Sequence, residues 1–437
     1  MHFSLWYDNQ GLRREGVVKM NKQQKFVPIL LGSDINVYGM ARSFHEAYGI
    51  VSEAYAGLQL APTKYTKIVN VHTISGFDKD PVFIEEMRKL GKETFNDPNT
   101  KYLLIACGDG YAELVSLHKK ELSEWFICPY VDFALLERLI SKVSFYDICE
   151  ENQLPYPKTL IIKESMLENG QLNQDLPFSF PVALKPANSV EWLSVDFEGR
   201  KKAFILDTRE EFDTILARIY QAGYTSEMIA QDFIPGDDSN MRVLNAYVDQ
   251  QHQVRMMCLG HPLLEDPSPE AIGNYVAIMP EYNEKIYQTI KAFLEKISYT
   301  GFANFDMKYD PRDGEYKLFE INLRQGRSSF FVTLNGLNLA QFVTEDRVFE
   351  IPFTETVYGK AQNDTAMLWM GVPKEVFVKF ARENEDKQRA LQLIEKDKWG
   401  TTVFYDKDMS PLRWVLMKYM FSKYKGRFEM FFKEKEG

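Results

Sequence analysis

The strongest constraint on this chain is a pair of short alternating runs near residue 300, GFANFDMKY and EYKLFEIN, joined by the turn DPRDG at Asp310 to Gly314. Alternation predicts strands, and a short turn rich in proline, aspartate and glycine predicts that they form a hairpin. Because strand side chains alternate between faces, we expect Asp306, Glu320 and Asn322 on one face. The opposite, core-facing side should carry Phe305, Met307, Phe319 and Ile321.

The polar face of this hairpin has the chemistry of a metal and phosphate site. Asp306, Glu320 and Asn322 offer two carboxylates and an amide oxygen, which are ligand types suited to Mg²⁺ held against phosphates. Arg324 follows two residues later, where a guanidinium can stabilise a phosphoryl group during transfer. The alternative for the hairpin alone is an ordinary solvent-facing surface. Together these residues predict an ATP-dependent enzyme.

Composition narrows the class of protein. The chain has 437 residues, 45% of them hydrophobic, which predicts several packed domains. Its net charge of -10 disfavours nucleic acid as a partner and favours a small-molecule substrate. There is no apolar run of roughly 18 residues, so we expect no spanning helix and a cytoplasmic protein. Four cysteines without a CxxC pair predict reduced, buried thiols, at Cys107, Cys128, Cys149 and Cys258.

The first 131 residues divide into a tail and a domain. We expect residues 1–19 to be a disordered extension, with a short ordered tail as the alternative. From Phe26 a buried strand leads through a turn at Gly32 to Asn36 into a helix that ends near Gly49. A similar step recurs after the run LLIAC. Residues 20–131 therefore predict a parallel α/β domain, whose loops at the strand ends could bind substrate.

The rest of the chain predicts two further regions. Residues 132–351 open with one helix, Asp132 to Glu150, and then alternate antiparallel strand pairs with helices, which is typical of an α+β domain. Residues 352–437 end in WVLMKYMFSKYKGRFEMFFKEKEG, where aromatic residues and methionines alternate with lysines. We expect a helical region whose last helix covers the core of the protein; weak peripheral contact with a membrane is the alternative.

The phosphate-binding motifs of other nucleotide enzymes are absent. The chain has no GxxxxGK[ST], and GDGYAE lacks the third glycine of a dinucleotide fingerprint. It has instead an ordered series: Lys142 near a helix end, Lys185 closing the run PVALK, the segment QDFIPGDD, and the carboxylate hairpin with Arg324. This series resembles the ATP-grasp superfamily, in which two α+β lobes hold ATP between them. The resemblance implies an ATP-grasp fold preceded by an N-terminal α/β domain.

The resemblance also implies roles for individual residues. Lys142 and Lys185 would contact the phosphates of ATP, and Lys185 and Arg324 would serve catalysis. Asp306 and Glu320 would bind Mg²⁺, with Glu320 bridging two ions and Asn322 completing the second. Gln231 stands where the family more often has glutamate. The implied adenine hinge is Gln231, Asp232, Phe233 and Ile234, with Asp238 at the ribose hydroxyls.

A closer resemblance extends over nearly the whole chain. The runs PILLGSDINVYGMARSFHEAYG, CGDGYAEL, VALKPANSVE, FIPGDDSNMRVLNAYV, CLGHPLLEDP and FEINLRQGRSSFFVT are similar to the D-aspartate ligases of peptidoglycan synthesis. Such enzymes join the β-carboxylate of D-aspartate to the lysine amine of UDP-MurNAc-pentapeptide, a nucleotide-linked precursor, while ATP becomes ADP and phosphate. This family implies D-aspartate and that precursor as partners.

A dicarboxylic amino acid also needs a cation for the carboxylate that does not react. Arg327 lies just beyond the metal strand and could supply it, although arginines in such turns are often structural. For His261 a hydrogen-bonded structural role is the alternative. The complete set of candidate substrate contacts is Arg327, Ser328, Ser329, His261, Ser33 and Tyr38.

Two other functions remain open from the sequence. A ligase with the same chemistry could use another small acid or amine, since the hairpin and the lysines would be unchanged. A protein of a different class, a nucleotide-binding regulator without turnover, could use ATP only to close its lobes. The presence of all three metal-ligand types favours the enzyme.

Overall fold

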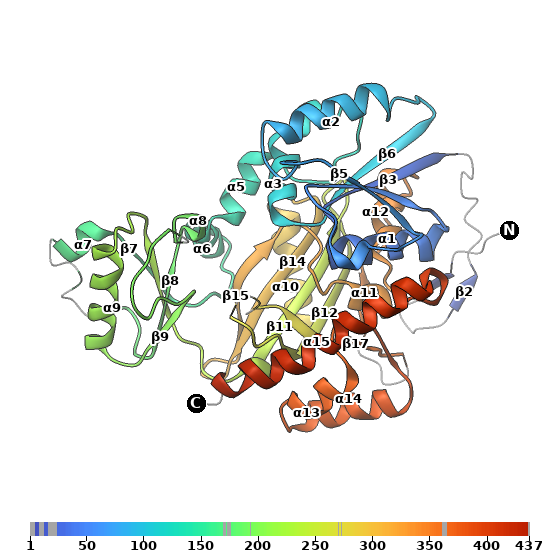
Figure 1. Ribbon diagram of the computed structural model, residues 1–437. Coiled ribbons are helices and arrows are strands. Elements are labelled where there is room, and N and C mark those ends of the chain that lie inside the picture. Colours follow the sequence, from blue (N-terminus) through green and yellow to red (C-terminus); the bar gives the residue numbers. More distant parts are fainter. Residues whose placement is uncertain are drawn as a thin grey trace.

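The computed structural model contains a central mixed sheet with a smaller sheet on either side (Figure 1). The eight-stranded central sheet lies between an N-terminal parallel sheet of four strands and a four-stranded antiparallel sheet that projects to the left of the view. The structure describes residues 5–7, 13–15, 24–168, 172, 176–192, 194–269, 271, 273–360 and 365–435. The expected extension, residues 1–19, lies mostly outside this part; within it β1 (Leu5–Tyr7) pairs with β2 (Arg13–Glu15).

The N-terminal domain is the parallel α/β unit that the strand and helix patterns predicted. Its strands run in the order β5-β4-β3-β6, and α1 ends at Gly49, whose φ of 69° is the left-handed conformation that glycine favours. Asp34 begins α1 by accepting hydrogen bonds from the N–H groups of Asn36 and Val37. The elements are β3 (Lys25–Leu31), α1 (Ile35–Tyr48), β4 (Ser52–Ala56), η1 (Ala61–Thr63), β5 (Val69–Thr73), α2 (Val82–Glu93), β6 (Thr100–Ala106), α3 (Asp109–Leu117) and α4 (Lys119–Leu122).

This strand order places two loops side by side. β4 and β6 flank β3 on opposite sides. The strands after β3 are therefore added first on one side of it and then, with β6, on the other. The loops that follow these two strands, residues 32–34 and 107–108, leave the same edge of the sheet. In open parallel sheets this is where ligands bind.

Two helices lead from this domain to the small lobe. The sequence pattern predicted one helix over 132–150, and this prediction is wrong at Ser141, which has an extended ψ of 119°. The break gives α5 (Phe133–Ile140) and α6 (Lys142–Glu151), and the Ser141 side chain caps α6 by accepting from the N–H of Ser144. Lys142 thereby stands in the first turn of α6.

The small lobe is a four-stranded antiparallel sheet covered by a helix. Its strands follow the order β7-β10-β8-β9, and apolar residues of α9 such as Phe212 and Leu216 pack on the sheet in one core. The elements are β7 (Thr159–Ile162), α7 (Glu164–Glu168), β8 (Val182–Pro186), α8 (Ser189–Trp192), β9 (Phe204–Leu206), α9 (Arg209–Gln221) and β10 (Met228–Asp232).

The large lobe holds the predicted hairpin at one edge of the central sheet. The turn closes through the N–H of Gly314, which donates to the carbonyl of Asp310 over 2.9 Å. A register shift after Asp306 pairs Met307 with Leu318, so Leu318 enters the core and the predicted core residue Phe319 is only half-buried. The elements are η3 (Asp238–Asn240), β11 (Met241–Val248), β12 (Val254–Glu265), β13 (Tyr275–Glu281), α10 (Glu284–Lys296), β14 (Gly301–Asp310) and β15 (Glu315–Asn322).

The two faces of the central sheet have different cover. One face packs against α10 in a core that includes Leu244, Leu259 and Phe305. The other face, which carries Val243 and Asp306 on neighbouring strands, packs against the N-terminal domain. The polar side of the hairpin therefore faces that domain.

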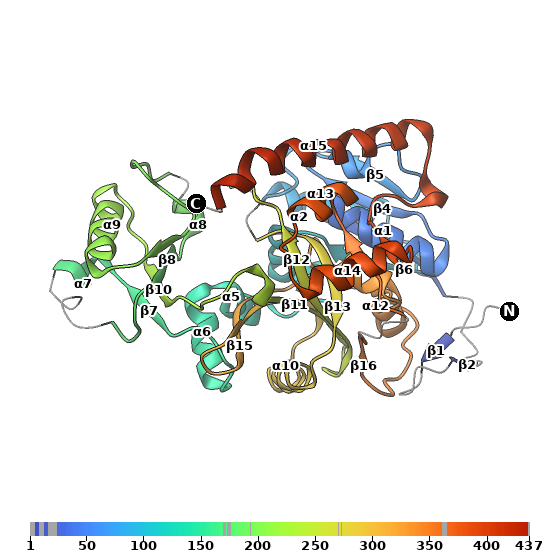
Figure 2. The same cartoon turned by 90° about the horizontal axis from the view of Figure 1, so that it is seen from below.

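The C-terminal region completes the central sheet. Its strands β17 and β18 extend the sheet beyond β13, and β16 pairs with β12. Figure 2 shows α13, α14 and α15 along one side of the molecule. The elements are α11 (Phe330–Leu334), α12 (Leu339–Arg347), β16 (Val357–Tyr358), β17 (Leu368–Met370), α13 (Lys374–Phe380), α14 (Glu385–Glu395), β18 (Trp399–Gly400), η4 (Asp406–Asp408) and α15 (Pro411–Lys435). Among the described residues, no helix is both long and apolar enough to cross a membrane.

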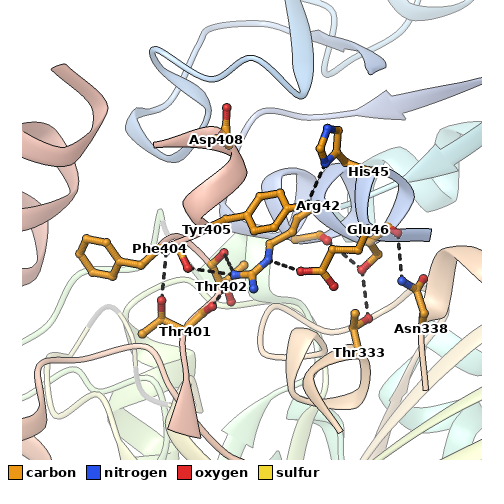
Figure 3. Close-up of polar contacts among 12 residues, drawn as sticks. Arg42, His45, Glu46, Thr333, Asn338, Thr401, Thr402, Phe404, Tyr405 and Asp408 are labelled. Carbon is orange, nitrogen blue, oxygen red and sulfur yellow. Dashed lines mark hydrogen bonds and ion pairs between the residues drawn. The ribbon is translucent and has the colours of Figure 1, made fainter. Parts of the chain in front are cut away.

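The C-terminal region is fastened to α1 by polar contacts (Figure 3). The guanidinium of Arg42 donates to the carbonyls of Thr401 and Thr402 over 2.7 and 2.8 Å and lies over the ring of Tyr405. His45 Nδ1 is 2.9 Å from the Tyr405 hydroxyl. These bonds fix α1, and with it the loop that precedes it, against the sheet.

Candidate active site

A cavity of about 340 Å³ lies where the hairpin meets the N-terminal domain. Strands β14 and β15, the loop after β15 and the start of α3 all contribute to its walls. The structure thus brings together the three predicted metal ligands, Arg324, Arg327 and Ser328. The full lining is Asp109, Lys202, Val243, Gly273, Asn274, Tyr275, Asn304, Asp306, Glu320, Asn322, Arg324, Arg327 and Ser328.

The hairpin register places the predicted metal ligands together. Asp306 pairs directly with Glu320, and Asn304 pairs with Asn322 on the next cross-strand position of the same face. Burial and the neighbouring charge of Glu320 raise the pKa of Asp306 to about 8, although Arg324 opposes the rise. The folded protein therefore holds two carboxylates close together with too little positive charge around them.

This donor set fits a hard divalent cation. Carboxylate and amide oxygens on one face are what Mg²⁺ accepts, and a cation would relieve the repulsion between Asp306 and Glu320. Within the described part of the chain, no group of three or more histidine, cysteine, aspartate or glutamate side chains forms a metal site. The site proposed for the hairpin has two carboxylates and the amide of Asn322.

The two predicted phosphate-binding lysines lie next to this cavity. Lys142 lines an adjoining cavity of about 180 Å³ together with Glu320 and Asn322. Burial, and then the charge of Lys142, lower the pKa of Lys185 to about 8, and Glu320 only partly opposes this. Burial likewise lowers the pKa of Lys142. Both ammonium groups would gain from an anion beside them, as a polyphosphate would provide.

The predicted hinge makes several contacts with its neighbours. The Gln231 amide donates to the Thr159 hydroxyl over 2.8 Å, and Arg312 binds the two Asp232 oxygens over 2.9 and 2.8 Å. Lys308 donates to the carbonyl of Ile234 over 2.9 Å, with its Nζ 5.3 Å from the centre of the Phe233 ring. The segment that joins the lobes is thus held from both sides.

Asp238 lies apart from the metal cavity. It lines a separate cavity of about 580 Å³ between η3, the end of β12 and the helices α13 and α14. Its charge opposes the burial that lowers the pKa of Lys308, which supports the hinge. Asp238 is therefore near the hinge and lines a different cavity from the carboxylate pair.

The loop after β15 connects the metal strand with the N-terminal domain. Arg324 Nη2 is 2.7 Å from Asp109 Oδ2 at the start of α3, and Arg324 Nε is buried without a hydrogen-bond partner. Arg327 is exposed at the cavity and Ser328 lines it. Ser329 is buried, its N–H and carbonyl form the turn that begins α11, and it is not among the residues that line the cavity.

Arg327 has an acidic neighbour in Asp34, which is not among the residues that line the cavity. Burial raises the pKa of Asp34, while the N–H of Val37 and the charge of Arg327 oppose that rise. Asp34 stands in the loop after β3, which is the predicted ligand-binding edge of the parallel sheet. Charges of both signs thus meet where an amino acid, which carries both, could bind.

Three predicted substrate contacts are not at the cavity. The Tyr38 side chain is fully buried, and its hydroxyl donates to Asp408 over 2.8 Å. Ser33 is buried, and its hydroxyl donates to the carbonyl of Leu58 over 2.6 Å. His261 is buried 2.7 Å from the carbonyl oxygen of Ser239. The structure therefore does not bring these three side chains to the cavity, and each has a polar contact elsewhere in the protein.

Sequence reasoning missed several residues at the cavity. Asp109 follows a strand in the turn GDG, and that position is a signal that could have found it. Asn304 shares the strand face of Asp306 two residues earlier, so alternation could have found it as well. Lys202 and Tyr275 carry no such signal. Asn245, which pairs with Asn304, has both amide atoms buried without a partner.

Comparisons with known proteins identify relatives of the whole chain. The chain is 75% identical over 416 residues to a D-aspartate ligase of Enterococcus faecium, and the match covers 95% of this chain and 99% of that one. No protein-family profile matches the chain.

Solved structures with the same fold are ATP-grasp ligases and related enzymes. N5-carboxyaminoimidazole synthetase from Staphylococcus aureus is 12% identical with a TM-score of 0.55, and the match covers 86% of each chain. An L-amino acid ligase from Bacillus licheniformis is 15% identical with a TM-score of 0.52, over 76% of this chain and 75% of that one. The biotin carboxylase domain of Hydrogenobacter thermophilus 2-oxoglutarate carboxylase, in complex with MgADP, is 12% identical with a TM-score of 0.56, over 79% and 74%. The fold is that of the ATP-grasp enzymes, and the sequence relationship shows that the chain belongs to the D-aspartate ligase family.

Proposed function

We propose that this ATP-grasp ligase joins the β-carboxylate of D-aspartate to the lysine side-chain amine of UDP-MurNAc-pentapeptide, while ATP becomes ADP and phosphate. The observation that carries the proposal is the 75% identity, over 95% of the chain, to a protein named D-aspartate ligase. The four cysteines are free and buried, which suits a reducing compartment, and we place the reaction in the cytoplasm.

The nucleotide would lie between the lobes. Lys142 and Lys185 have lowered pKa values in the absence of an anion, and the phosphates of ATP would supply the missing negative charge. The hinge from Gln231 to Ile234 would hold the base through its backbone, and Asp238 beside it would contact the ribose. The contacts around the hinge support this assignment, because Arg312 holds the Asp232 side chain and Lys308 holds the Ile234 carbonyl before a nucleotide binds.

Two Mg²⁺ ions would be held by the hairpin, with Glu320 shared between them. When bound, the metal offsets the charge of the phosphates and of the incoming carboxylate. Asp306 would ligate the first ion and Asn322 the second. Burial, and then the charge of Glu320, raise the pKa of Asp306 to about 8, and this supports the role of the pair as metal ligands.

The chemistry requires that a carboxylate be activated. A carboxylate is a poor electrophile, so the γ-phosphoryl of ATP is first transferred to it, and the resulting acyl phosphate has a good leaving group. Arg324 would stabilise the phosphoryl group in transfer, and its buried, unpartnered Nε supports that role. Arg327 would hold the carboxylate that does not react. The neutral amine of the second substrate then attacks the acyl carbon, and phosphate leaves.

One assay tests this proposal. Purified protein is incubated with ATP, Mg²⁺, the lysine-containing precursor and either D- or L-aspartate, and ADP and the new amide are measured. We expect both products with D-aspartate, and neither from the Glu320→Gln variant. A preference for L-aspartate or another acid would show a different substrate. Nucleotide binding without any product from a panel of acids and amines would show a regulator in place of an enzyme.

A further inference from the structure

The last helix, α15, presents an apolar face to solvent. Positions 412, 415, 419 and 430 fall on one side of a helix because they recur at close to the helical period. The side chains there are 65%, 60%, 58% and 67% exposed: Leu412, Val415, Tyr419 and Met430. Trp414, about 100° around the helix from Val415, is 50% exposed at the border of this face. The opposite side of α15, with Met417 and Phe428, is fully buried, so the helix has already used one apolar face to pack on the protein.

This exposed face is bordered by positive charge. From Pro411 to Phe428 the sequence has five basic residues and no acidic one, in a protein whose net charge is -10. Arg413 and Arg427 are used in ion pairs with Asp408 and Asp266. Three exposed lysines remain along the helix: Lys418, Lys423 and Lys425.

Two of the three lysines lie against aromatic rings of the helix. Lys418 Nζ lies 5.6 Å from the centre of the Trp414 ring, and Lys423 Nζ lies 4.6 Å from that of Tyr419. These contacts are cation–π pairs, in which the ammonium group itself lies against an aromatic ring at the surface of the helix. Aromatic and aliphatic side chains flanked by lysines are the composition of helices that lie in the headgroup region of a bilayer.

The loop beside the first turn of α15 has the same character. Arg413 donates to the carbonyls of Pro62 and Lys64, both over 2.9 Å, and so fastens this loop to the helix. The loop exposes apolar side chains with a lysine among them: Leu58, Leu60, Lys64 and Tyr65. Figure 2 shows α15 running along the upper edge of the view.

We propose that this face of α15 binds the surface of an anionic lipid bilayer, with the helix lying in the plane of the headgroups. A second copy of the chain fits less well, since a two-fold interface through this face would bring Lys418, Lys423 and Lys425 against their own copies. A bilayer with anionic headgroups suits both the apolar face and the lysines, because its interior accepts the apolar side chains and its headgroups attract the lysines. This binding does not depend on the identity of the ligase substrates.

Vesicle sedimentation tests the proposal with the full-length protein. We expect co-sedimentation with vesicles of phosphatidylglycerol and phosphatidylcholine, little with phosphatidylcholine alone, and release by salt. Val415→Asp should weaken binding about tenfold by placing a charge among the inserted side chains. The matched control is Ile205→Asp in β9 of the small lobe, which is 59% exposed where Val415 is 60%, and it should bind as the parent does. Circular dichroism melts confirm that both variants fold.

Tryptophan emission gives a second reading. Trp414 should shift to the blue when vesicles are added, and Trp414→Phe should remove most of that shift while keeping sedimentation. Equal binding to anionic and neutral vesicles, or equal binding by Val415→Asp and the parent, would overturn the proposal. So would a parent that is dimeric in analytical ultracentrifugation and becomes monomeric on Val415→Asp, because the face would then join two copies.

Discussion

The carboxylate pair of Asp306 and Glu320 suits the proposed metal site but lowers the stability of the metal-free protein. The pKa of Asp306 is raised to about 8 by burial and by Glu320, so the folded protein resists its ionisation. A folded pKa above the unfolded value means that stability is greatest at low pH and falls as pH rises from about 4 to about 8. Metal ligands of this kind are costly to fold around when no cation is present.

Replacing Asp306 by asparagine should therefore stabilise the protein free of metal and nucleotide. We expect Asp306→Asn to raise the free energy of unfolding by about 1 to 3 kcal/mol at pH 8 and by less at pH 5, while ligase activity is lost. Denaturant unfolding at the two pH values, with chelator present, measures the difference. A variant whose stability differs from the parent by the same amount at both values would contradict this reading.

Lys185 should make nucleotide affinity depend on pH. Its pKa is lowered to about 8, so the ammonium that would meet the phosphates is present below that pH and is lost above it. ATP affinity should fall by up to about tenfold per pH unit above 8. Lys185→Arg keeps its charge and should flatten this dependence. Calorimetric titration with ATP between neutral and alkaline pH measures this dependence for the parent and for Lys185→Arg. If the affinities of both proteins fall equally with pH, Lys185 is not the group responsible.

Sequence reasoning succeeded for single residues where the signal was local. Alternation along each strand, together with the pairing expected of a hairpin, placed Asp306, Glu320 and Asn322 on one face, and all three line the same cavity. It failed for Tyr38, whose partner Asp408 lies 370 residues later in the chain. No local pattern reports a contact between segments so far apart.

At the level of elements, the hinge and the hairpin turn act as one unit. Arg312 in the turn binds Asp232 at the end of β10 and also Asp310 over 2.7 Å. Through these bonds the hairpin that carries the metal ligands is coupled to the segment that joins the lobes. A bidentate arginine pair gives this link a defined geometry.

Removing this link should weaken nucleotide binding more than turnover. We expect Arg312→Ala to raise KM for ATP about three- to tenfold with a smaller change in kcat, because the hinge loses its support and no reacting group is touched. Arg138→Ala, which breaks another exposed ion pair, with Glu151, is the control. Steady-state kinetics on both variants decide the matter; equal KM values would show that the pair is only a surface contact.

Element boundaries were predictable to the extent that caps and turns are local. The end of α1 at Gly49 and the turn before Gly314 followed from the conformations that glycine favours. The break at Ser141 could not be predicted, since the apolar spacing of a helix continues through it. The register shift after Asp306 could not be predicted either, since the sequence alternation continues through it. Tertiary packing, which the sequence does not display, decides both.

Across the whole molecule, Asp408 joins the C-terminal region to the N-terminal domain. It is fully buried, and it accepts hydrogen bonds from the hydroxyls of Tyr38 and Thr66 and from the N–H of Lys67. Arg413 Nε, also fully buried, is 3.2 Å away. Removing one partner of such a group leaves an uncompensated charge inside the protein.

Asp408→Ala should be severely destabilising. We expect a loss of about 3 to 5 kcal/mol, because Arg413 would stay buried without its carboxylate. Asp406→Ala, at an exposed position of the same short helix, should change stability by less than about 0.5 kcal/mol. Denaturant unfolding of both variants provides the measurement. A similar midpoint for Asp408→Ala and the parent would show that the two regions are held by other contacts.

The pairing of β17 with β13 has a consequence for how the protein is made. Ala277 and Ile278 on β13 find their partners, Met370 and Trp369, about ninety residues further along. While the ribosome is still synthesising that later stretch, the nascent polypeptide exposes an open row of peptide groups on β13. Messages cut short before codon 368 should therefore yield insoluble product, even though every proposed catalytic side chain has already been translated.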